Sequence, residues 1–273
     1  MIIPLFLSII LVTLSFPTAF GDFVLPDMGF LIWIALVPAL VAMMRKNWHH
    51  AGRYGAALAF GYYLLSMYWL FFAMKNFGGL SATLSVLVLM LLALILAAYA
   101  GFAFFSASFL YRRYAVPVSL TLPFFWIVCE WLRERMPFNG YPWSAFAYAL
   151  GYSPRLMQNA DIFSVIGLSA FILMVNFFIA CAWCGGDLDR EVGGEAHSSW
   201  SRAKMRLRSP SLKLALGLCV ALYLSGFALL RSVDVRVTQV MQNREPLRTA
   251  LIQGNIPQDE KWNPVSSNHM RLS

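Results

Sequence analysis

Few side chains in this chain are placed to make or break bonds. It has four histidines, which are His49, His50, His197 and His269. None has Cys, Asp or Glu at the spacing of a metal site, and Cys181 and Cys184 form a CxxC pair inside an apolar run, where cysteine behaves as a small hydrophobic residue. The sequence also lacks a glycine-rich phosphate loop and a nucleophile with a positioned base. We therefore expect no metal, no cofactor and no catalytic residue in these 273 residues.

The most informative polar residues lie between positions 130 and 143. Glu130 and Arg133 are three residues apart and can pair on one helical face, and the aromatic segment Asn139-Gly-Tyr-Pro-Trp143 follows. One interpretation is structural, an ion pair within the aromatic belt typical of membrane proteins. The other is a lipid-headgroup site, because arginine offers a two-pronged donor to phosphate. Both interpretations stay open, and Glu130, Arg133 and Trp143 are our candidate substrate-binding residues in this region.

Composition indicates which elements must position these residues. The chain is 59% hydrophobic and 12% charged, with a mean hydropathy of +0.64, whereas about 25% of the residues of a soluble protein are charged. Its net charge of +8 comes from basic residues between long apolar runs, which is typical of multi-pass membrane proteins and not of nucleic-acid binders. Four cysteines in or beside apolar stretches argue against a disulfide scaffold. We expect an all-α polytopic membrane helix bundle.

Seven apolar runs are candidates for crossing the bilayer, whose hydrocarbon core needs about 20 helical residues. They are residues 2–20, 29–44, 54–74, 80–111, 114–132, 162–184 and 214–230. The fourth run has 32 residues, so it must tilt, bend near Gly101 or protrude. Asp161 and Asn176 are costly in lipid and should face neighbouring helices.

The distribution of basic residues predicts the orientation of these seven runs. With the N-terminus inside, the inner loops hold eleven basic residues and the outer loops up to Leu230 hold four. The four are Lys75, Arg133, Arg135 and Arg155. Because cytoplasmic loops are enriched in Lys and Arg, this bias favours a cytoplasmic N-terminus and an outer tail after Arg231, which would be periplasmic in a bacterium.

Several sequence blocks occur in an order that resembles one family, the apolipoprotein N-acyltransferases. The blocks are Leu14-Ser-Phe-Pro17, Trp33-Ile-Ala-Leu-Val-Pro38, Phe60-Gly61, Tyr68-Trp69, Phe77-Gly-Gly79, Glu130-Trp-Leu-Arg133, Gly140-Tyr-Pro-Trp143, Gly151-Tyr152, Gln158, Gly167-Leu-Ser169, Ala250-Leu-Ile-Gln-Gly-Asn-Ile-Pro-Gln258 and Lys261-Trp262. The block ending at Gln258, with Lys261-Trp262, is the most specific. The resemblance runs from the first apolar run almost to the end of the chain.

This resemblance implies a fold and a reaction. Members of the family have a membrane helix bundle, a periplasmic nitrilase-like α-β-β-α domain and a last C-terminal helix, and they lie in the bacterial inner membrane. They move an acyl chain from a phospholipid donor to the N-terminal amine of the diacylglyceryl-cysteine of a lipoprotein acceptor. A Cys thiolate is the nucleophile, a Glu the general base, and a Lys stabilises the oxyanion, which suits a two-step acyl transfer.

The resemblance also divides the chain. Residues 1–231 correspond to the membrane bundle, and residues 232–273 to a periplasmic tail that holds the incomplete start of the nitrilase-like domain, with its first strand at Arg248-Thr-Ala-Leu-Ile-Gln. We expect the catalytic Glu, Lys and Cys beyond Ser273, so that this chain would be the non-catalytic N-terminal part. Trp262 matches a tryptophan near the family's active-site entrance, and it joins Glu130, Arg133 and Trp143 as a candidate substrate-binding residue.

Two alternatives to an enzyme part remain. The chain could be a stand-alone membrane module that binds lipid or lipoprotein, or the partner of a separately encoded nitrilase-like subunit. A small transporter is less favoured, because the sequence shows no inverted repeat and no matching pair of broken helices.

Overall fold

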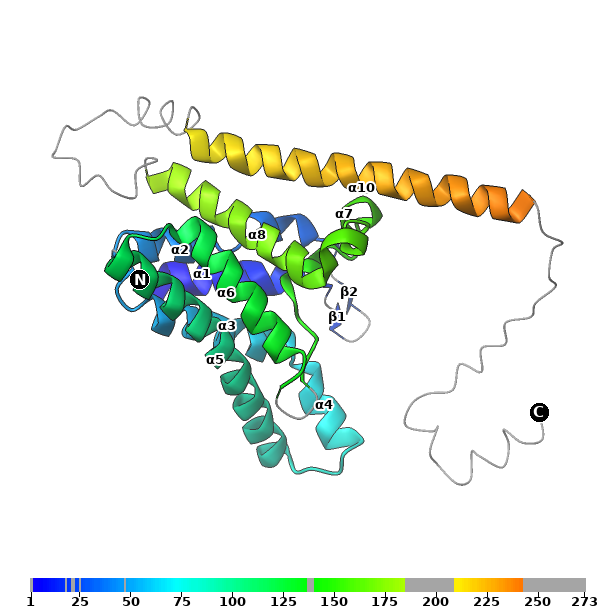
Figure 1. The fold of residues 1–273 in the computed structure, drawn as a ribbon. Helices are drawn as coiled ribbons and strands as arrows, with labels where there is room; N and C mark the ends of the chain where they lie inside the picture. The colour runs from blue at the N-terminus through cyan, green and yellow to red at the C-terminus, as the bar shows by residue number, and fades with distance from the viewer. Residues whose placement is uncertain are drawn as a thin grey trace, which may run out of the picture.

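The computed structural model describes residues 2–17, 19–20, 23–24, 26–46, 48–136, 140–184 and 209–242. Within these ranges the chain is a bundle of helices with one two-stranded antiparallel pair, β1 (Ala19–Phe20) and β2 (Phe23–Val24) (Figure 1). The predicted first strand of the nitrilase-like domain and Trp262 lie outside the described residues. The expectation of a helical membrane bundle is confirmed, and the nitrilase-like start stays a prediction.

Each predicted apolar run forms a helix or a pair of helices. The N-terminal half contains α1 (Ile2–Ser15), the 3-10 helix η1 (Gly29–Trp33), α2 (Val37–Met44), α3 (Ala51–Ser66), α4 (Trp69–Asn76) and α5 (Ala82–Tyr114). The second half contains α6 (Val118–Arg133), the 3-10 helix η2 (Phe146–Leu150), α7 (Pro154–Met157), α8 (Ala160–Cys184) and α10 (Pro210–Gln242).

Three of these helices, α5, α8 and α10, are long and apolar enough to cross a membrane. The bent pair α3 and α4, which turns by 53° between its two parts, makes a fourth if it counts as one span. The helix α1 and the segment Gly29–Met44 are apolar but shorter. The structure therefore shows three or four spans among the described residues, and the count of seven crossings stays a prediction.

The length of α5 follows from signals at its two ends. Ser81 caps its start, with its side-chain oxygen accepting a hydrogen bond from the Leu84 amide at 3.3 Å. At its end Ala115 adopts the left-handed conformation with φ of 54°, and Pro117 follows. Its 33 residues span about 50 Å, which exceeds the hydrocarbon core.

Gly101 does not bend α5. The helix is continuous through it, and a side chain there would meet the Cβ of Ala56 at 2.9 Å and the carbonyl oxygen of Gly52 at 3.2 Å on α3. Gly55 makes the reciprocal close approach, because a Cβ on it would lie 2.4 Å from the Phe104 ring. The glycine in this long run therefore allows α3 and α5 to pack closely, and the extra length protrudes or tilts instead.

The larger of two apolar core clusters joins α1, α2, α3, α5, α6 and α8 among the described residues. Asn176 on α8 lies fully buried in it, accepting a hydrogen bond from the Leu36 amide at 2.9 Å and donating to the Ile32 carbonyl at 2.8 Å. This confirms that Asn176 faces its neighbours. The same expectation for Asp161 was wrong, because that side chain is exposed in the first turn of α8 and accepts a hydrogen bond from Gln158.

The helix α10 is attached differently from the others. It lies along one side of the bundle against α8 and α7, and its C-terminal part projects beyond them (Figure 1). Only 17% of its most apolar stretch is buried, against 44% for α8. It also continues to Gln242 without a break at residues 231 and 232, where the sequence predicted a boundary between bundle and tail.

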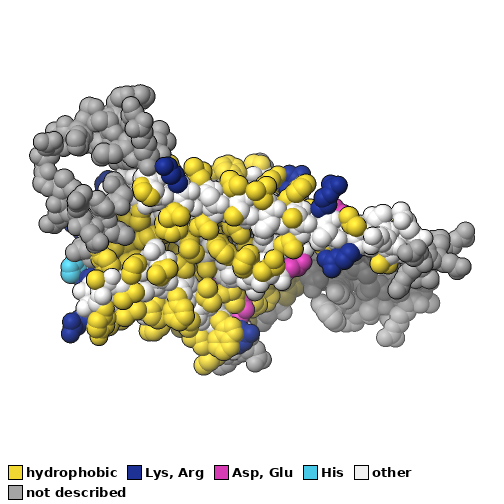
Figure 2. All heavy atoms as spheres, turned by 45° about the horizontal axis from the view of Figure 1, so that its top comes forward, with side chains coloured by type: hydrophobic (Ala, Val, Ile, Leu, Met, Phe, Trp, Pro, Cys, Tyr) yellow, Lys and Arg dark blue, Asp and Glu magenta, His cyan; other side chains and the backbone are white. Residues whose placement is uncertain are grey.

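The outer surface suits a hydrocarbon environment. Hydrophobic side chains cover much of the face shown in Figure 2, and the few charged ones lie mainly near its edges. Exposed apolar residues run along α5 and α10, including Leu87, Leu94 and Phe105 on α5 and Leu216 and Leu224 on α10. A soluble monomer rarely exposes so continuous an apolar surface, which is the expected arrangement when lipid is the solvent.

Candidate functional site

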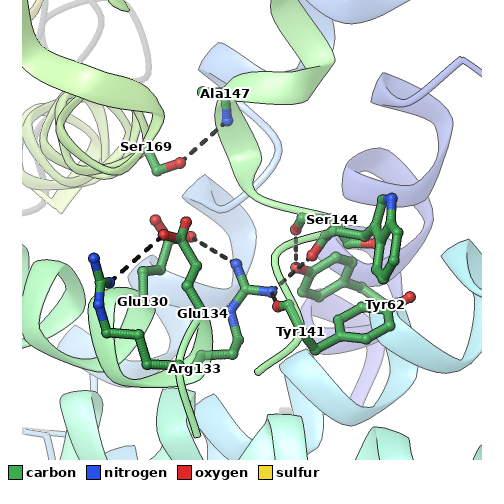
Figure 3. Close-up of polar contacts among 10 residues, drawn as sticks. Tyr62, Glu130, Arg133, Glu134, Tyr141, Ser144, Ala147 and Ser169 are labelled. Atoms are coloured by element: carbon green, nitrogen blue, oxygen red, sulfur yellow. Dashed lines mark hydrogen bonds and ion pairs between the residues drawn. The ribbon is translucent and has the colours of Figure 1, made fainter. Parts of the chain in front are cut away.

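The predicted pair of Glu130 and Arg133 forms at the end of α6 and is buried. The two side chains are one helical turn apart, with Arg133 Nη2 lying 3.8 Å from Glu130 Oε1 (Figure 3). Glu130 is 4% exposed and Arg133 1% exposed. Such burial leaves no open face at which this guanidinium could receive a lipid phosphate directly.

The donors of Arg133 are directed at the following loop. Its Nη1 donates to the carbonyl oxygens of Tyr141 and Trp143, each at 2.7 Å, and the amide of Tyr141 donates back to the Arg133 carbonyl at 2.7 Å (Figure 3). Charged donors make stronger hydrogen bonds than neutral ones. The arginine therefore holds the loop against the end of α6.

Gly140 is required for this return of the chain. It has φ of 79°, in the left-handed region, and a Cβ at this position would lie 2.1 Å from the carbonyl oxygen of Glu134. Glycine is the one residue type without that atom. The Gly140-Tyr-Pro-Trp143 segment thus bends back over the last turn of α6 because position 140 carries no side chain.

Tyrosines of α3 complete the support of the loop. Tyr62 is 2% exposed and donates its hydroxyl to the Ser144 carbonyl at 2.5 Å, and the Arg133 guanidinium lies 5.9 Å from the centre of the Tyr63 ring. Beyond the loop, the Phe146 ring stacks on Trp126 with centroids 4.8 Å apart. The loop is therefore fixed by α3 and α6 together.

The loop presents one exposed aromatic side chain, Trp143. It is 55% exposed and meets the 43% exposed Trp69, at the start of α4, edge to face with ring centroids 6.5 Å apart. Tyr141 lies beside it at 5.1 Å, and burial raises the pKa of the Tyr141 phenol to about 12, so this group stays neutral at ordinary pH. Trp69 and Trp143 form an exposed aromatic pair, which we call the tryptophan pair.

The cavity beside Glu130 and Arg133 is too small for a substrate. A cavity of about 10 Å³ lies between α3, α5 and α6, enough for about one water molecule. Its lining residues are Tyr63, Tyr99, Ala100, Trp126, Cys129, Glu130 and Arg133. Any lipid contact at this site must therefore take place at the tryptophan pair and not in the buried polar cluster.

The other candidate groups are not brought together. Cys129 and Cys181 are buried, Cys219 is half-buried and Cys184 is exposed at the end of α8. Among the residues that the structure describes, no three His, Cys, Asp or Glu side chains could jointly hold a metal ion. Sequence reasoning did not single out Trp69 or Tyr62, although Tyr68-Trp69 was among the blocks on which the resemblance depends.

Known proteins match this chain along most of its length. Residues 8–178 match the apolipoprotein N-acyltransferase N-terminal domain. An apolipoprotein N-acyltransferase of Geobacter metallireducens is 31% identical over 94% of this chain and 44% of its own length. That of Haemophilus ducreyi is 29% identical over 86% of this chain and 39% of its own length. That of Nitrosomonas europaea is 27% identical over 83% of this chain and 40% of its own length. The chain thus spans less than half the length of these relatives.

Proposed function

The chain belongs to the apolipoprotein N-acyltransferase family, and we propose that it forms the membrane part of an enzyme that transfers an acyl chain from a phospholipid to the N-terminal amine of a diacylated lipoprotein. In this proposal the chain contributes no catalytic residue. It anchors the enzyme in the bacterial inner membrane and brings lipid substrates to a nitrilase-like domain that begins in residues 232–273.

The observation that carries this proposal is the tryptophan pair. Tryptophan is amphipathic and favours the level of lipid headgroups, and here Trp143 and Trp69 are exposed side by side. An aromatic pair at this level could guide the glycerol and upper acyl segments of a lipid toward a neighbouring catalytic domain. Trp143 is therefore the proposed contact residue.

Glu130 and Arg133 enter the proposal as positioning residues. Both are buried, and Nη1 of the arginine donates to the Tyr141 and Trp143 carbonyls. They would act on the substrate indirectly, by fixing the position of Trp143. Trp262, by its match to the family block, remains a proposed substrate contact on the tail.

The proposed topology has seven crossings, a cytoplasmic N-terminus and a periplasmic tail. In this arrangement Trp143 faces the periplasm and Arg113, in the last turn of α5, faces the cytoplasm. Single cysteines at these two positions, in a variant without the native cysteines, test it with a membrane-impermeant maleimide on intact cells. Labelling at Trp143→Cys and none at Arg113→Cys is expected, and the reverse pattern contradicts the orientation.

Acyl transfer itself should be measured in membranes that contain the native product with an N-terminal tag. A mass roughly twice 30.7 kDa, as one further domain would add, together with acylation of a diacylglyceryl peptide from phospholipid, is expected. A product near 30.7 kDa without transfer would contradict the enzyme proposal and favour a stand-alone lipid-binding module or a separately encoded catalytic partner.

Trp143→Ala in this tagged product tests the role of the tryptophan pair. Loss of one exposed aromatic contact should lower kcat/KM for the phospholipid donor roughly tenfold, equivalent to about 1.4 kcal/mol. Trp131→Ala is the matched control, because Trp131 is 49% exposed on α6 and stacks on Arg135 away from the loop. Equal losses in the two variants would show that the effect is not specific to the pair.

A further inference from the structure

A second opening lies away from the tryptophan pair, between α10 and the bundle. It has a volume of about 360 Å³. Its lining residues are Trp33, Leu156, Cys219, Val220, Tyr223 and Leu224. Apart from the Tyr223 hydroxyl and the Trp33 ring nitrogen, this lining is apolar. We call this opening the α10 cleft.

The α10 cleft opens toward the side that lipid would cover. Val220 and Leu224 line it and are 56% and 59% exposed, and α10 is the helix with the smallest buried share of the three long spans. An apolar opening that stays empty loses the dispersion contacts of its lining atoms. In a bilayer an acyl chain can fill such an opening.

Arg155 stands beside one end of the α10 cleft. Its side chain is exposed, its guanidinium lies 5.5 Å from the Tyr223 ring centre and 5.7 Å from that of Phe227, and it donates a hydrogen bond to the Tyr223 hydroxyl. The ion pairs found in the described part of the chain are Glu130 with Arg133 and Glu134 with Arg135. Arg155 thus has a positive charge that no described carboxylate pairs.

The order of these groups along α10 matches the shape of a phospholipid. Phe227 marks the level of Arg155 on α10, and Cys219 precedes Phe227 by eight residues. Along the helix axis, Cys219 therefore lies about 12 Å from the level of Arg155. With the proposed orientation, Arg155 is near the outer surface and the α10 cleft extends from it toward the membrane centre. One phospholipid molecule would place its phosphate at Arg155 and an acyl chain in the α10 cleft.

The junction between α7 and α10 keeps this arrangement in place. Asn159 is fully buried and donates to the Leu222 carbonyl at 2.8 Å, and it accepts from the Ser225 hydroxyl at 2.6 Å. Gly226 touches the backbone of Arg155, because a Cβ there would lie 1.6 Å from that carbonyl oxygen. The cation and the α10 cleft are therefore held at a fixed separation.

We propose that the α10 cleft binds one outer-leaflet phospholipid as a structural ligand, with its phosphate on Arg155 and an acyl chain between α10 and Trp33. This lipid fills the seam beside a weakly buried helix. It goes beyond the proposed function, because it requires neither catalysis nor the tryptophan pair.

Native mass spectrometry of the 273-residue chain, purified in mild detergent from membranes and washed free of loose lipid, tests the proposal. The wild type should retain about one phospholipid per chain. Val220→Trp, which fills the α10 cleft, and Arg155→Gln, which removes the phosphate contact, should each lower retention at least fivefold. Both positions are exposed, so neither change disturbs the core.

Matched controls make the result specific. Leu214→Trp adds the same ring at a 55% exposed position on another face of α10, and Arg113→Gln removes an exposed arginine at the opposite end of the bundle. Both should retain the lipid. A wild type without bound phospholipid, or loss in only one of the two test variants, overturns the two-point site. Displacement of the lipid by inorganic phosphate would identify a simple anion site and would equally overturn it.

Discussion

Replacing Arg133 by leucine tests whether a buried arginine holds the aromatic loop. The change removes two charged hydrogen bonds of 2.7 Å to the carbonyls of Tyr141 and Trp143 and leaves Glu130 without its partner. Removing one member of a buried ion pair costs about 3–5 kcal/mol in free energy of unfolding. By the scaling for soluble chains of similar size, this corresponds to a loss of roughly 6–20 °C in Tm.

The assay is thermal unfolding of the detergent-solubilised protein, with Glu130→Leu and the double variant as the other corners of a cycle. Because the double variant carries no unpaired carboxylate, it should be more stable than the sum of the two single losses predicts. Arg133→Lys should rescue only part of the loss, since Nη1 bonds both carbonyls while Nη2 lies beside Glu130, and one ammonium nitrogen cannot occupy both places. A Tm for Arg133→Leu within about 2 °C of the wild type would refute the reasoning, since that shift corresponds to at most about 1 kcal/mol by the same scaling.

Three further predictions concern other contacts. Gly226→Val should detach α10 and lower Tm, because its Cβ would lie 1.6 Å from the Arg155 carbonyl, whereas Gly217→Val, with nothing within 4 Å, should leave Tm unchanged. Asn176→Leu should cost about 1–3 kcal/mol by leaving buried backbone groups unpaired, and an unchanged thermal unfolding curve would contradict this. Because the folded-state pKa of Tyr141 is raised to about 12 from 10.0, stability should fall above pH 10, and Tyr141→Phe should reduce that fall in an alkaline unfolding series.

The helices were the part of the fold most accessible from sequence. Long apolar runs bounded by charges must form helices in a membrane, because each backbone polar group needs a partner there, and all seven runs contain helices in the structure. The bend between Ser66 and Trp69 was not predicted, since no proline or glycine marks it. The extension of α10 through residues 231–242 was not predicted. Its polar composition indicates the start of a tail, but a polar segment can also form an exposed helix.

The site was only half predictable for a related reason. A spacing of three residues is enough to predict that Glu130 and Arg133 pair, but whether the pair faces lipid or protein depends on elements far away in sequence. Tyr62 on α3 and the loop that follows Gly140 enclose the arginine, and neither approach can be read from local pattern. The spacing therefore leaves the aromatic-belt and headgroup interpretations both open, and the 1% exposure of Arg133 shows that its guanidinium is enclosed by protein.

Arg133 and Arg155, both on the side predicted to face outward, have very different surroundings in this fold. The protein itself surrounds Arg133 with a carboxylate and two carbonyls, and a group so enclosed can only position other residues. Arg155 instead rests on two aromatic rings and forms no ion pair with a described carboxylate, and the apolar α10 cleft begins beside it. Where water is scarce an unpaired cation is costly. The lipid headgroup is the anion that the bilayer provides at that level, and for this reason the lipid-binding test belongs at Arg155 and the stability test at Arg133.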